Sequence, residues 1–222
     1  MPGPAYADYG RQGLRYGKIA SGHTRQDKGM PDLVSPVVPC GRIRNQPQPT
    51  FSVGELTVRP WLRDDAAAVV AAYSDRDIQQ WHTQSLTLDE AASWLAAWAD
   101  RWRAETGANW AVTQAGALVG RVGFRAISLP EGLAEVAYWT VPAARGRNIA
   151  ARVVRAASTW MFQSVGLNRV ELHHSTLNTP SCRIAQKAGF RYEGTKRRQA
   201  LHQDGWHDMH LHARLADDEI AG

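Results

Sequence analysis

A short turn rich in arginine and glycine, Arg145-Gly146-Arg147-Asn148, stands directly before an apolar helical pattern that begins at Ile149. The first N–H groups of a helix have no partner within the helix and lie at the positive end of its dipole. Gly146 permits close approach of the backbone, and Asn148 tolerates a left-handed conformation. Such a turn can bind a pyrophosphate group. Arg-Gly turns also occur on many protein surfaces without a ligand. The neighbouring segments are therefore needed to judge whether this turn binds a pyrophosphate.

The segments around this turn have the patterns of strands and helices. Residues 134–141 have the β-branched and aromatic content of a strand and lead straight into the turn. Apolar residues then recur at helical spacing as far as Gly166, namely Ile149, Val153, Ala157, Trp160 and Met161. Residues 169–176 predict a second strand, and a second helix begins near Asn178 and ends before Gly189. The pattern predicts a strand-helix-strand-helix unit.

The preceding part of the chain predicts further elements. Thr87 and Glu90 form a capping box ahead of a helix that extends to about residue 105. Three tryptophans recur on one side of this helix, which is typical of a core seam, with an aromatic acceptor pocket as the alternative; they are Trp94, Trp98 and Trp102. Residues 109–114 and 117–127 predict a hairpin. The expected order is strand, two helices, three strands, helix, strand, helix and two strands.

Further motifs accompany these elements. They are Leu56-Thr-Val-Arg-Pro-Trp61, Glu135-Val-Ala-Tyr138-Trp139, Asn178-x-x-Ser181, Lys187-Ala-Gly-Phe190, Glu193-Gly194 and Trp206-His-Asp208. Together with the turn they resemble the GNAT acetyltransferases, most closely the RimJ/RimL-type branch, over about residues 55 to 216. The resemblance implies the GNAT acyl-CoA N-acyltransferase fold, an α+β fold in layers. Its mixed, mostly antiparallel sheet has about seven strands, is flanked by about four helices and is splayed at the fourth and fifth strands.

The resemblance implies an acetyl-CoA-dependent N-acetyltransferase that moves the acetyl group to a primary amine by direct attack in a ternary complex. Acetyl-CoA is the implied co-substrate, and a longer acyl group is the alternative. The strand end would bind the pantetheine arm, the turn the pyrophosphate, and the second helix the arm from the far side. The residues implied are Trp139, Thr140, Val141, Arg145, Gly146, Arg147, Asn148, Ile149, Ala150, Asn178 and Ser181.

Two side chains are expected to act on the reacting groups. An α-amino group has a pKa of about 7.7 to 8.0 in peptides and needs modest help to lose its proton. The matching glutamate of the family faces the acceptor, so Glu135 is the candidate base, with an ordinary exposed strand residue as the alternative. Ser181 stands where the branch has a serine able to hydrogen-bond the coenzyme sulfur. The N–H of Val141 is the expected donor to the thioester oxygen.

Two positions depart from the family pattern. Asn148 replaces the usual glycine of the turn, which predicts weaker or reshaped phosphate contacts. Ala185 stands where many relatives carry a tyrosine that protonates the departing thiolate, so that acid is absent. These departures favour a function of another class, a non-catalytic acyl-CoA sensor or scaffold. The presence of Glu135 and Ser181 argues against it.

The expected acceptor follows from the family branch and from four pocket candidates, Trp81, His82, Tyr138 and Asp208. Asp208 would favour a cationic amine, and a surface carboxylate is the alternative. The branch acetylates protein N-termini, small amines and antibiotics. We expect a protein N-terminal or peptide-like amine, with a ribosomal protein among the candidate partners. A small-molecule amine or antibiotic is the alternative, and a homodimer is compatible with the resemblance.

The chain of 222 residues is long enough for one enzyme domain and an appendage. Residues 1–50 hold 7 of the 19 Gly and 7 of the 11 Pro, which predicts a flexible or wrapping arm before a domain at 51–222. This arm has 7 Lys and Arg against 3 Asp and Glu, so it carries most of the net charge of +5. Because solvated basic tails are common, we expect no nucleic-acid partner. Met30 is an alternative start of translation.

The composition excludes several other classes. No apolar run approaches the ~20 residues that cross a bilayer, and the N-terminus lacks the zones of a signal peptide. We therefore expect a cytoplasmic protein without a membrane partner. Cys40 and Cys182 are too few for a disulfide framework and are expected to be free thiols.

The eight histidines raise the question of a metal site. Strand alternation would place Asp208, His210 and His212 on one face and His207 on the other. The same alternation points the side chains of the pair His173-His174 to opposite faces. This spacing lacks the ligands from separate elements that are usual in catalytic sites, so we expect no metal.

Overall fold

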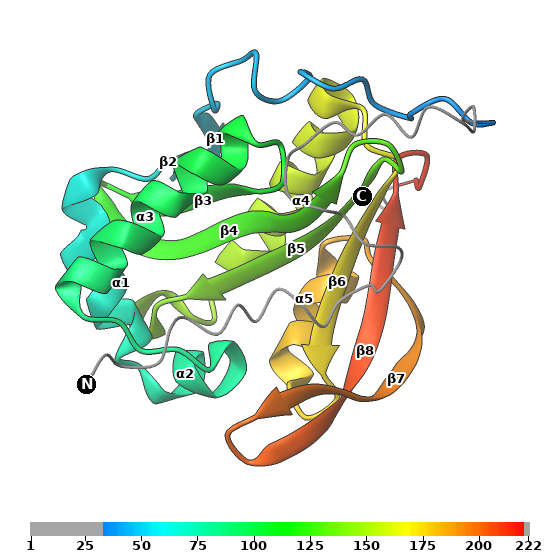
Figure 1. Ribbon diagram of the computed structural model, residues 1–222. Helices are drawn as coiled ribbons and strands as arrows, with labels where there is room; N and C mark the ends of the chain where they lie inside the picture. The colour runs from blue at the N-terminus through cyan, green and yellow to red at the C-terminus, as the bar shows by residue number, and fades with distance from the viewer. Residues whose placement is uncertain (1–32, 220–222) are drawn as a thin grey trace, which may run out of the picture. The chain divides into compact units, whose positions relative to one another are not determined.

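A sheet of eight strands organises the part of the chain that the structure describes (Figure 1). The structure is a computed structural model that describes residues 33–219. The chain divides into two compact units, Met1–Ser35 and Pro36–Gly222, and every element below belongs to the second. The strand order is β1-β2-β3-β4-β5-β6-β8-β7. The strands are β1 (Phe51–Val53), β2 (Leu56–Pro60), β3 (Ala108–Gln114), β4 (Ala117–Ser128), β5 (Leu133–Thr140), β6 (Arg169–Ser175), β7 (Arg191–His202) and β8 (Gly205–Leu215).

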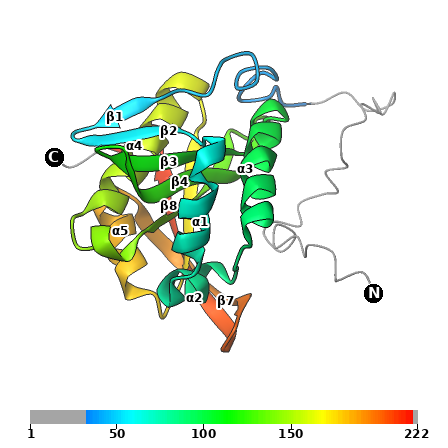
Figure 2. The same cartoon turned by 90° about the vertical axis from the view of Figure 1, so that its left-hand side faces the viewer.

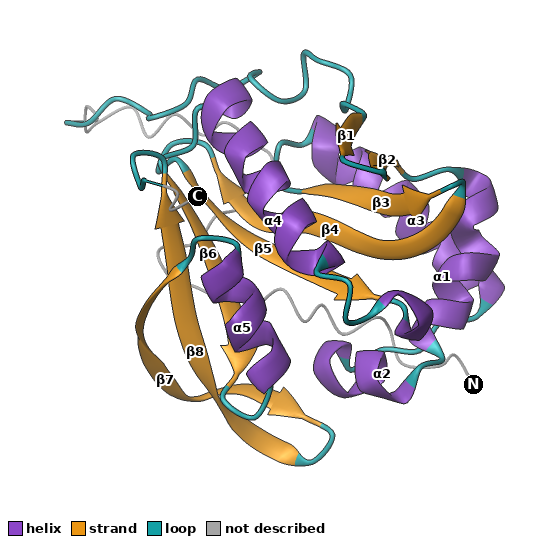
Figure 3. Ribbon diagram, turned by 180° about the vertical axis from the view of Figure 1, so that it is seen from behind, coloured by secondary structure: helices purple, strands orange, loops and turns teal. Residues whose placement is uncertain are grey.

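Helices cover both faces of this sheet. They are α1 (Ala66–Tyr73), α2 (Arg76–His82), α3 (Leu88–Arg103), α4 (Ile149–Trp160) and α5 (Thr179–Lys187). Figure 2 shows α1 and α3 on one face, and Figure 3 shows α4 and α5 on the other. A π-helical turn, Met161–Val165, continues α4 as far as Gly166, which has a left-handed conformation. No helix within residues 33–219 combines the length and the apolar character that a membrane crossing needs.

The architecture confirms the α+β layered fold that the sequence predicted. The strand-helix-strand-helix unit, the hairpin of β3 and β4 and the capped helix α3 are all present. The structure adds β1 at one edge of the sheet and α2 between α1 and α3. All neighbouring strand pairs of the described sheet are antiparallel except β5 and β6, which run parallel. This parallel pair lies where the sheet was expected to splay.

Two apolar clusters hold the layers together. One fixes α4 to the sheet and includes Val112, Val122, Val136, Val153, Ala157 and Met161. The other fixes α1, α2 and α3 to the opposite face and includes Val69, Tyr73, Ile78, Leu95 and Trp139. Burying a side chain of this size stabilises the fold by about 1.5–3 kcal/mol. Trp98 and Trp102 are buried, and Trp94 packs edge-on against Tyr73, so the tryptophan stripe is a core seam.

Residues 36–50, which the sequence analysis assigned to the arm, belong to the compact domain. Val38 and Ile43 are buried in the main core at 2% and 1% exposure. The carboxylate of Glu105 accepts the N–H groups of Gly41 and Ile43, both at 2.7 Å. The expected boundary at residue 50 is therefore too late. Most of the expected arm, residues 1–32, lies outside the described residues, so its character stays a prediction.

Candidate active site

Strands β5 and β6 pair only along part of their length. Their parallel register ends at Val136↔Leu172, and Figure 1 shows the two strands diverging beyond this point. On its other edge β5 stays paired with β4 as far as Thr140. Residues 137–140 of β5 therefore have a strand neighbour on one edge and an open edge on the other.

The direction of the backbone groups at this open edge follows from one hydrogen bond. The N–H of Val141 donates to the carbonyl of Val119 at 3.1 Å, just beyond the paired part of β4 and β5. Successive strand residues point their backbone groups to opposite edges, so Trp139 also faces β4. Tyr138 and Thr140 face the open edge. Because the N–H of Val141 is already engaged, its expected role as donor to a thioester oxygen is wrong.

The turn after β5 has the left-handed residues that its sequence predicted. Gly146 has a φ of 77° and Asn148 a φ of 57°, so Asn148 adopts the conformation that glycine would supply. Asn148 begins α4 without a side-chain cap, which leaves the first N–H groups of this helix for another acceptor. A Cβ atom added to Gly146 would meet nothing within 4 Å. The turn therefore offers an open anion site at the positive end of α4.

The two arginines of the turn are held by protein partners. Arg145 forms ion pairs with Asp75 at 2.5 Å and with Asp77 at 2.6 Å. Arg147 donates to the side-chain oxygen of Gln114 at 2.7 Å. The site is therefore made of backbone N–H groups, and Arg145 links it to the start of α2. Direct contact of either arginine with a pyrophosphate stays a prediction.

Asn178 caps the start of helix α5, and its side-chain oxygen accepts the N–H of Ser181 at 3.1 Å. Asn178 is buried and Ser181 is half-buried, so the cap fixes the serine at the first turn of the helix. Ala185 lies one turn further on and is fully buried in the core. A tyrosine at that position would overpack the core. The missing acid of the family therefore has no room to be restored at this position.

Tyr138 supplies a buried hydroxyl close to this first turn. Burial raises the pKa of Tyr138 to about 12, and the nearby Ser181 hydroxyl opposes the rise. The Tyr138 hydroxyl has no hydrogen-bond partner of good geometry within residues 33–219. A protonated, unpartnered hydroxyl beside a serine is suited to stabilise or protonate a leaving thiolate.

Helix α2 contacts the open edge of β5 through His82. The Nε2 of His82 donates to the carbonyl oxygen of Tyr138 at 3.0 Å. Burial lowers the pKa of His82 to about 3, so the ring is neutral at pH 7. The preceding Trp81 packs its ring edge-on against the β7–β8 hairpin, at His202 and His207. Three of the expected pocket residues, Trp81, His82 and Tyr138, therefore lie together.

Asp208, the fourth expected pocket residue, has a structural contact that the sequence did not indicate. Its carboxylate accepts the backbone N–H of Arg198 at 2.7 Å. Arg198 has a φ of 46° and lies where the register between β7 and β8 shifts. Asp208 therefore helps to fix this irregular part of the hairpin. A contact between Asp208 and a cationic amine stays a prediction.

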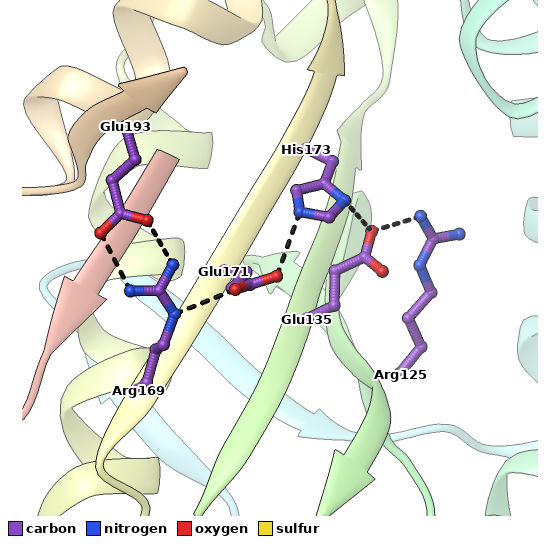
Figure 4. A network of polar contacts seen from close by, with 6 residues as sticks. All are labelled: Arg125, Glu135, Arg169, Glu171, His173 and Glu193. Atoms are coloured by element: carbon purple, nitrogen blue, oxygen red, sulfur yellow. Dashed lines mark hydrogen bonds and ion pairs between the residues drawn. The ribbon is translucent and has the colours of Figure 1, made fainter. Parts of the chain in front are cut away.

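Glu135 belongs to a chain of alternating acidic and basic side chains (Figure 4). Its Oε1 is 2.5 Å from the guanidinium of Arg125 and 3.7 Å from Nδ1 of His173. The Nε2 of the same histidine lies 3.1 Å from the carboxylate of Glu171. Both contacts of Glu135 go to Oε1, which leaves Oε2 without a polar partner among the described residues. The strand alternation puts Glu135 on the face that Trp139 shares, opposite Tyr138.

The chain of charges continues away from β5. Arg169 bonds Glu171 at 2.9 Å and also pairs with Glu193 of β7. The hydrogen bond from His173 lowers the pKa of Glu171 to about 2, with Arg169 adding to the effect. Sequence reasoning found Glu135 but missed Arg125 and His173 as its partners. The parallel register that puts Glu135 opposite Glu171 is what brings these side chains together.

A layered sheet whose one parallel pair diverges, followed by a helix that starts without a side-chain cap, is the architecture of the acyl-CoA N-acyltransferase class. A family model described as the acetyltransferase (GNAT) domain matches residues 55–191. The chain belongs to this family, and it is an enzyme that acetylates amines. The sequence resemblance is confirmed.

Individual relatives agree with this assignment. The uncharacterized N-acetyltransferase YoaA of Bacillus subtilis is 26% identical over 161 residues, which cover 71% of this chain and 90% of YoaA. The ribosomal-protein-serine acetyltransferase of Escherichia coli is 28% identical over 102 residues, 46% of this chain and 57% of that protein. RimJ of Mycobacterium smegmatis, solved with a CoA-disulfide, has a TM-score of 0.71 at 22% identity and covers 77% of this chain and 88% of RimJ.

Proposed function

We propose that this protein transfers an acetyl group from acetyl-CoA to the α-amino group of a protein or peptide, with both substrates bound at once. One observation carries the proposal. The open edge of β5 at Tyr138 and Thr140 leads directly into the turn before α4, where backbone N–H groups are free. A pantetheine arm can pair with the strand backbone while the pyrophosphate binds residues 146–150. The CoA-bound RimJ structure supports this choice of co-substrate.

Glu135 is the base in this proposal. Its Oε2 accepts the proton of the acceptor ammonium group, directly or through one water molecule. Arg125 and His173 hold the carboxylate through Oε1, so its position is fixed before the substrates bind. The neutral amine then attacks the thioester carbon and forms the new C–N bond.

Tyr138 and Ser181 act on the other side of the sheet. As the C–N bond forms, the N–H of Tyr138 at the open edge donates to the oxygen that becomes anionic. The C–S bond then breaks, Ser181 hydrogen-bonds the leaving thiolate, and the Tyr138 hydroxyl protonates it. The nitrogen gives up its extra proton to solvent water, and the Tyr138 oxygen regains a proton from solvent. The products are the acetylated amine and coenzyme A. In this proposal Tyr138 supplies the proton that many relatives take from a tyrosine at the position of Ala185.

The acceptor is inferred from the surface beside His82. An open pocket between α2 and the β7–β8 hairpin is lined by amide and charged side chains, namely Arg76, Gln79, Gln80, Gln203 and Asp204. These groups offer both donors and acceptors, which suits a peptide backbone better than a small apolar amine. The E. coli relative named as a ribosomal-protein-serine acetyltransferase supports the same class of acceptor.

The test is acetyl transfer by the full chain, followed as release of free thiol from acetyl-CoA. A panel of peptides with free α-amino groups should support release, whereas the same peptides with blocked N-termini should not. If only small amines support thiol release, the acceptor is a small amine and the proposed peptide acceptor is wrong. Tight binding of acetyl-CoA without thiol release for any acceptor would contradict the catalytic proposal and favour a sensor.

A further inference from the structure

Four side chains with metal-binding atoms converge between α5 and the sheet. They are His174 of β6, Cys182 of α5, and His210 and His212 of β8. One ligand atom of each lies within 4.8 Å of all the others. The Nε2 atoms of His174 and His212 are 3.2 Å apart, and Sγ of Cys182 is 3.9 Å from Nε2 of His212. Figure 3 shows α5 lying over the strands that carry the histidines.

These separations fit the shell of a small tetrahedral ion. Zinc binds nitrogen at about 2.0–2.1 Å and thiolate at about 2.3 Å, which places tetrahedral neighbours about 3.3–3.6 Å apart. The nitrogen pair of His174 and His212 is already at this distance. The sulfur of Cys182 is a few tenths of an ångström too far from Nε2 of His212, and the remaining pairs, which lie within 4.8 Å, have to close by up to about 1.5 Å. Imidazole and thiolate are the ligands that zinc prefers in proteins.

The protonation of the two closest rings gives an independent argument. Nδ1 of His174 lies 2.8 Å from the carbonyl oxygen of Ser175, so it carries the proton and leaves Nε2 with a lone pair. Nδ1 of His212 is buried and has no hydrogen bond of good geometry within residues 33–219, although a backbone group of Phe190 lies close to the ring. If His212 is protonated at Nε2, a bare Nδ1 stays buried. If it is protonated at Nδ1, two lone pairs face each other across 3.2 Å, and a cation between them removes the conflict.

The cluster is partly closed to water. His174 and His212 are 5% and 0% exposed, and Cys182 and His210 are half-buried. The ring of Tyr192 packs over the cluster, with its centroid 5.1 Å from that of His210 and 5.5 Å from that of His212.

We propose that His174, Cys182, His210 and His212 bind one zinc ion in a closed tetrahedral site. The site replaces the expectation of no metal, because the chain supplies ligands from three separate elements. Four protein ligands leave no open position, so the ion acts as a cross-link rather than as a Lewis acid. It ties the first turn of α5 to β6 and β8. The proposal does not depend on acetyl transfer.

The ion would also affect the neighbouring candidate active site. Cys182 follows Ser181 directly, and the same first turn carries the cap made by Asn178. A cross-link at Cys182 fixes the position of the Ser181 hydroxyl relative to Tyr138 of β5. Loss of the ion is therefore expected to loosen α5 before it loosens the rest of the sheet.

Cobalt titration of the untagged, full-length protein tests the site. After treatment with a chelator and a thiol reductant, the protein should bind one equivalent of Co²⁺. The spectrum should show the visible bands of a tetrahedral ion and a thiolate-to-cobalt charge-transfer band, and one equivalent of Zn²⁺ should bleach both. A weak octahedral spectrum, or no binding by the wild-type protein, would overturn the proposal.

Matched variants assign the ligands. Cys182→Ser should lose the charge-transfer band, whereas Cys40→Ser should keep it. His210→Gln, at a half-buried position, should weaken Co²⁺ binding by more than about tenfold. Even the loss of a residue that only hydrogen-bonds a metal ligand costs about that much in metal affinity. His202→Gln should bind like the wild type. If the charge-transfer band survives in Cys182→Ser, the proposed ligand set is wrong, and this holds whether or not His210→Gln folds.

Discussion

The Nε2 of His82 donates a hydrogen bond to the carbonyl oxygen of Tyr138 at 3.0 Å. This contact joins the end of α2 to β5 at the point where β6 has turned away. It engages the carbonyl of Tyr138 and leaves the N–H of the same residue facing the open edge. A ligand that pairs with β5 must therefore approach beside His82, which makes this histidine part of the expected site and gives it a measurable pH signature.

The stability of the protein should depend on pH through His82. Its pKa is about 3 in the folded protein and about 6.5 in the unfolded chain, so the unfolded state binds more protons between these values. The free energy of unfolding should therefore fall as the pH drops from 7 toward 4. In His82→Gln, which keeps an N–H donor for Tyr138, the fall should be smaller. Urea denaturation across this pH range measures both curves, and parallel curves would contradict a buried neutral imidazole.

Two of the three carboxylates of the charged chain should differ in their effect on catalysis. Glu135→Gln should lower kcat by about 10²- to 10⁴-fold, the usual contribution of a positioned base. Glu171→Gln removes a carboxylate of the same network, but both of its oxygens already bond His173 and Arg169. It should change kcat only a few-fold. Equal losses in steady-state assays would mean that the network acts through structure alone.

Local signals in the sequence were sufficient for the turn and for the order of the elements other than β1 and α2. Thr87 and Glu90 exchange the hydrogen bonds of a capping box, and Gly146 and Asn148 take the left-handed conformations that their types allow. Each signal lies within a few residues of the feature it predicts. The strand alternation that separates His173 from His174 is also local, and it is confirmed by their contacts with Glu171 and His212.

The remaining features depend on contacts between distant residues. The pairing of Arg145 with Asp75 spans 70 positions, and nothing near Arg145 in the sequence indicates it. The meeting of His174 with His212 depends on the register of β6 against β8. The anchoring of residues 36–46, of which Val38, Gly41 and Ile43 are buried, depends on Glu105, which lies far along the chain. Composition alone assigned this segment to the arm because it is rich in Gly and Pro.

The anchoring of this segment predicts a specific loss of stability. Glu105 accepts the N–H groups of Gly41 and Ile43 at 2.7 Å and that of Arg44 at 3.2 Å. Glu105→Gln should lower the free energy of unfolding by about 2 kcal/mol, because buried donors lose a charged acceptor. Limited proteolysis should then cleave within residues 36–46. Glu131→Gln, which changes an exposed side chain, is the control and should leave both measurements unchanged.

The same anchor should weaken in acid. Burial alone would raise the pKa of Glu105, but the three N–H groups outweigh burial and hold its pKa below the usual value of 4.5. Because the pKa of Glu105 is lower in the folded protein than in the unfolded chain, its carboxylate stabilises the protein at pH values above the unfolded pKa. This stabilisation is lost as the pH falls through the folded pKa. The difference in unfolding free energy between wild type and Glu105→Gln should shrink below about pH 4. A constant difference would contradict an ionised Glu105.

Tyr138→Phe should separate catalysis from stability. The hydroxyl that it removes is buried and has no hydrogen-bond partner of good geometry within residues 33–219, so the free energy of unfolding should stay constant or rise. kcat should fall by about 100-fold if this hydroxyl protonates the thiolate. In contrast, Tyr73→Phe removes the oxygen that accepts from buried Arg121 at 2.9 Å and should lower stability by about 1–3 kcal/mol with kcat nearly unchanged. Unchanged kcat in Tyr138→Phe would exclude it as the acid.

Two glycines allow a matched test of coenzyme binding at the turn. Gly146 and Gly116 both have a left-handed backbone, with φ of 77° and 82°, and a Cβ atom at either would meet nothing within 4 Å. Valine at either position therefore introduces similar backbone strain, of about 1–2 kcal/mol. Gly146 lies in the turn before α4, whereas Gly116 lies in the β3–β4 hairpin.

Gly146→Val should raise the dissociation constant of coenzyme A by at least about tenfold, because a side chain at the turn displaces the backbone from the pyrophosphate. The dissociation constant of a peptide acceptor should change far less. Gly116→Val should leave both constants unchanged, although its loss of stability should be comparable. Isothermal titration with coenzyme A and with peptide measures these values. If Gly116→Val weakens coenzyme binding as much as Gly146→Val does, the effect comes from strain, and the turn is not the pyrophosphate site.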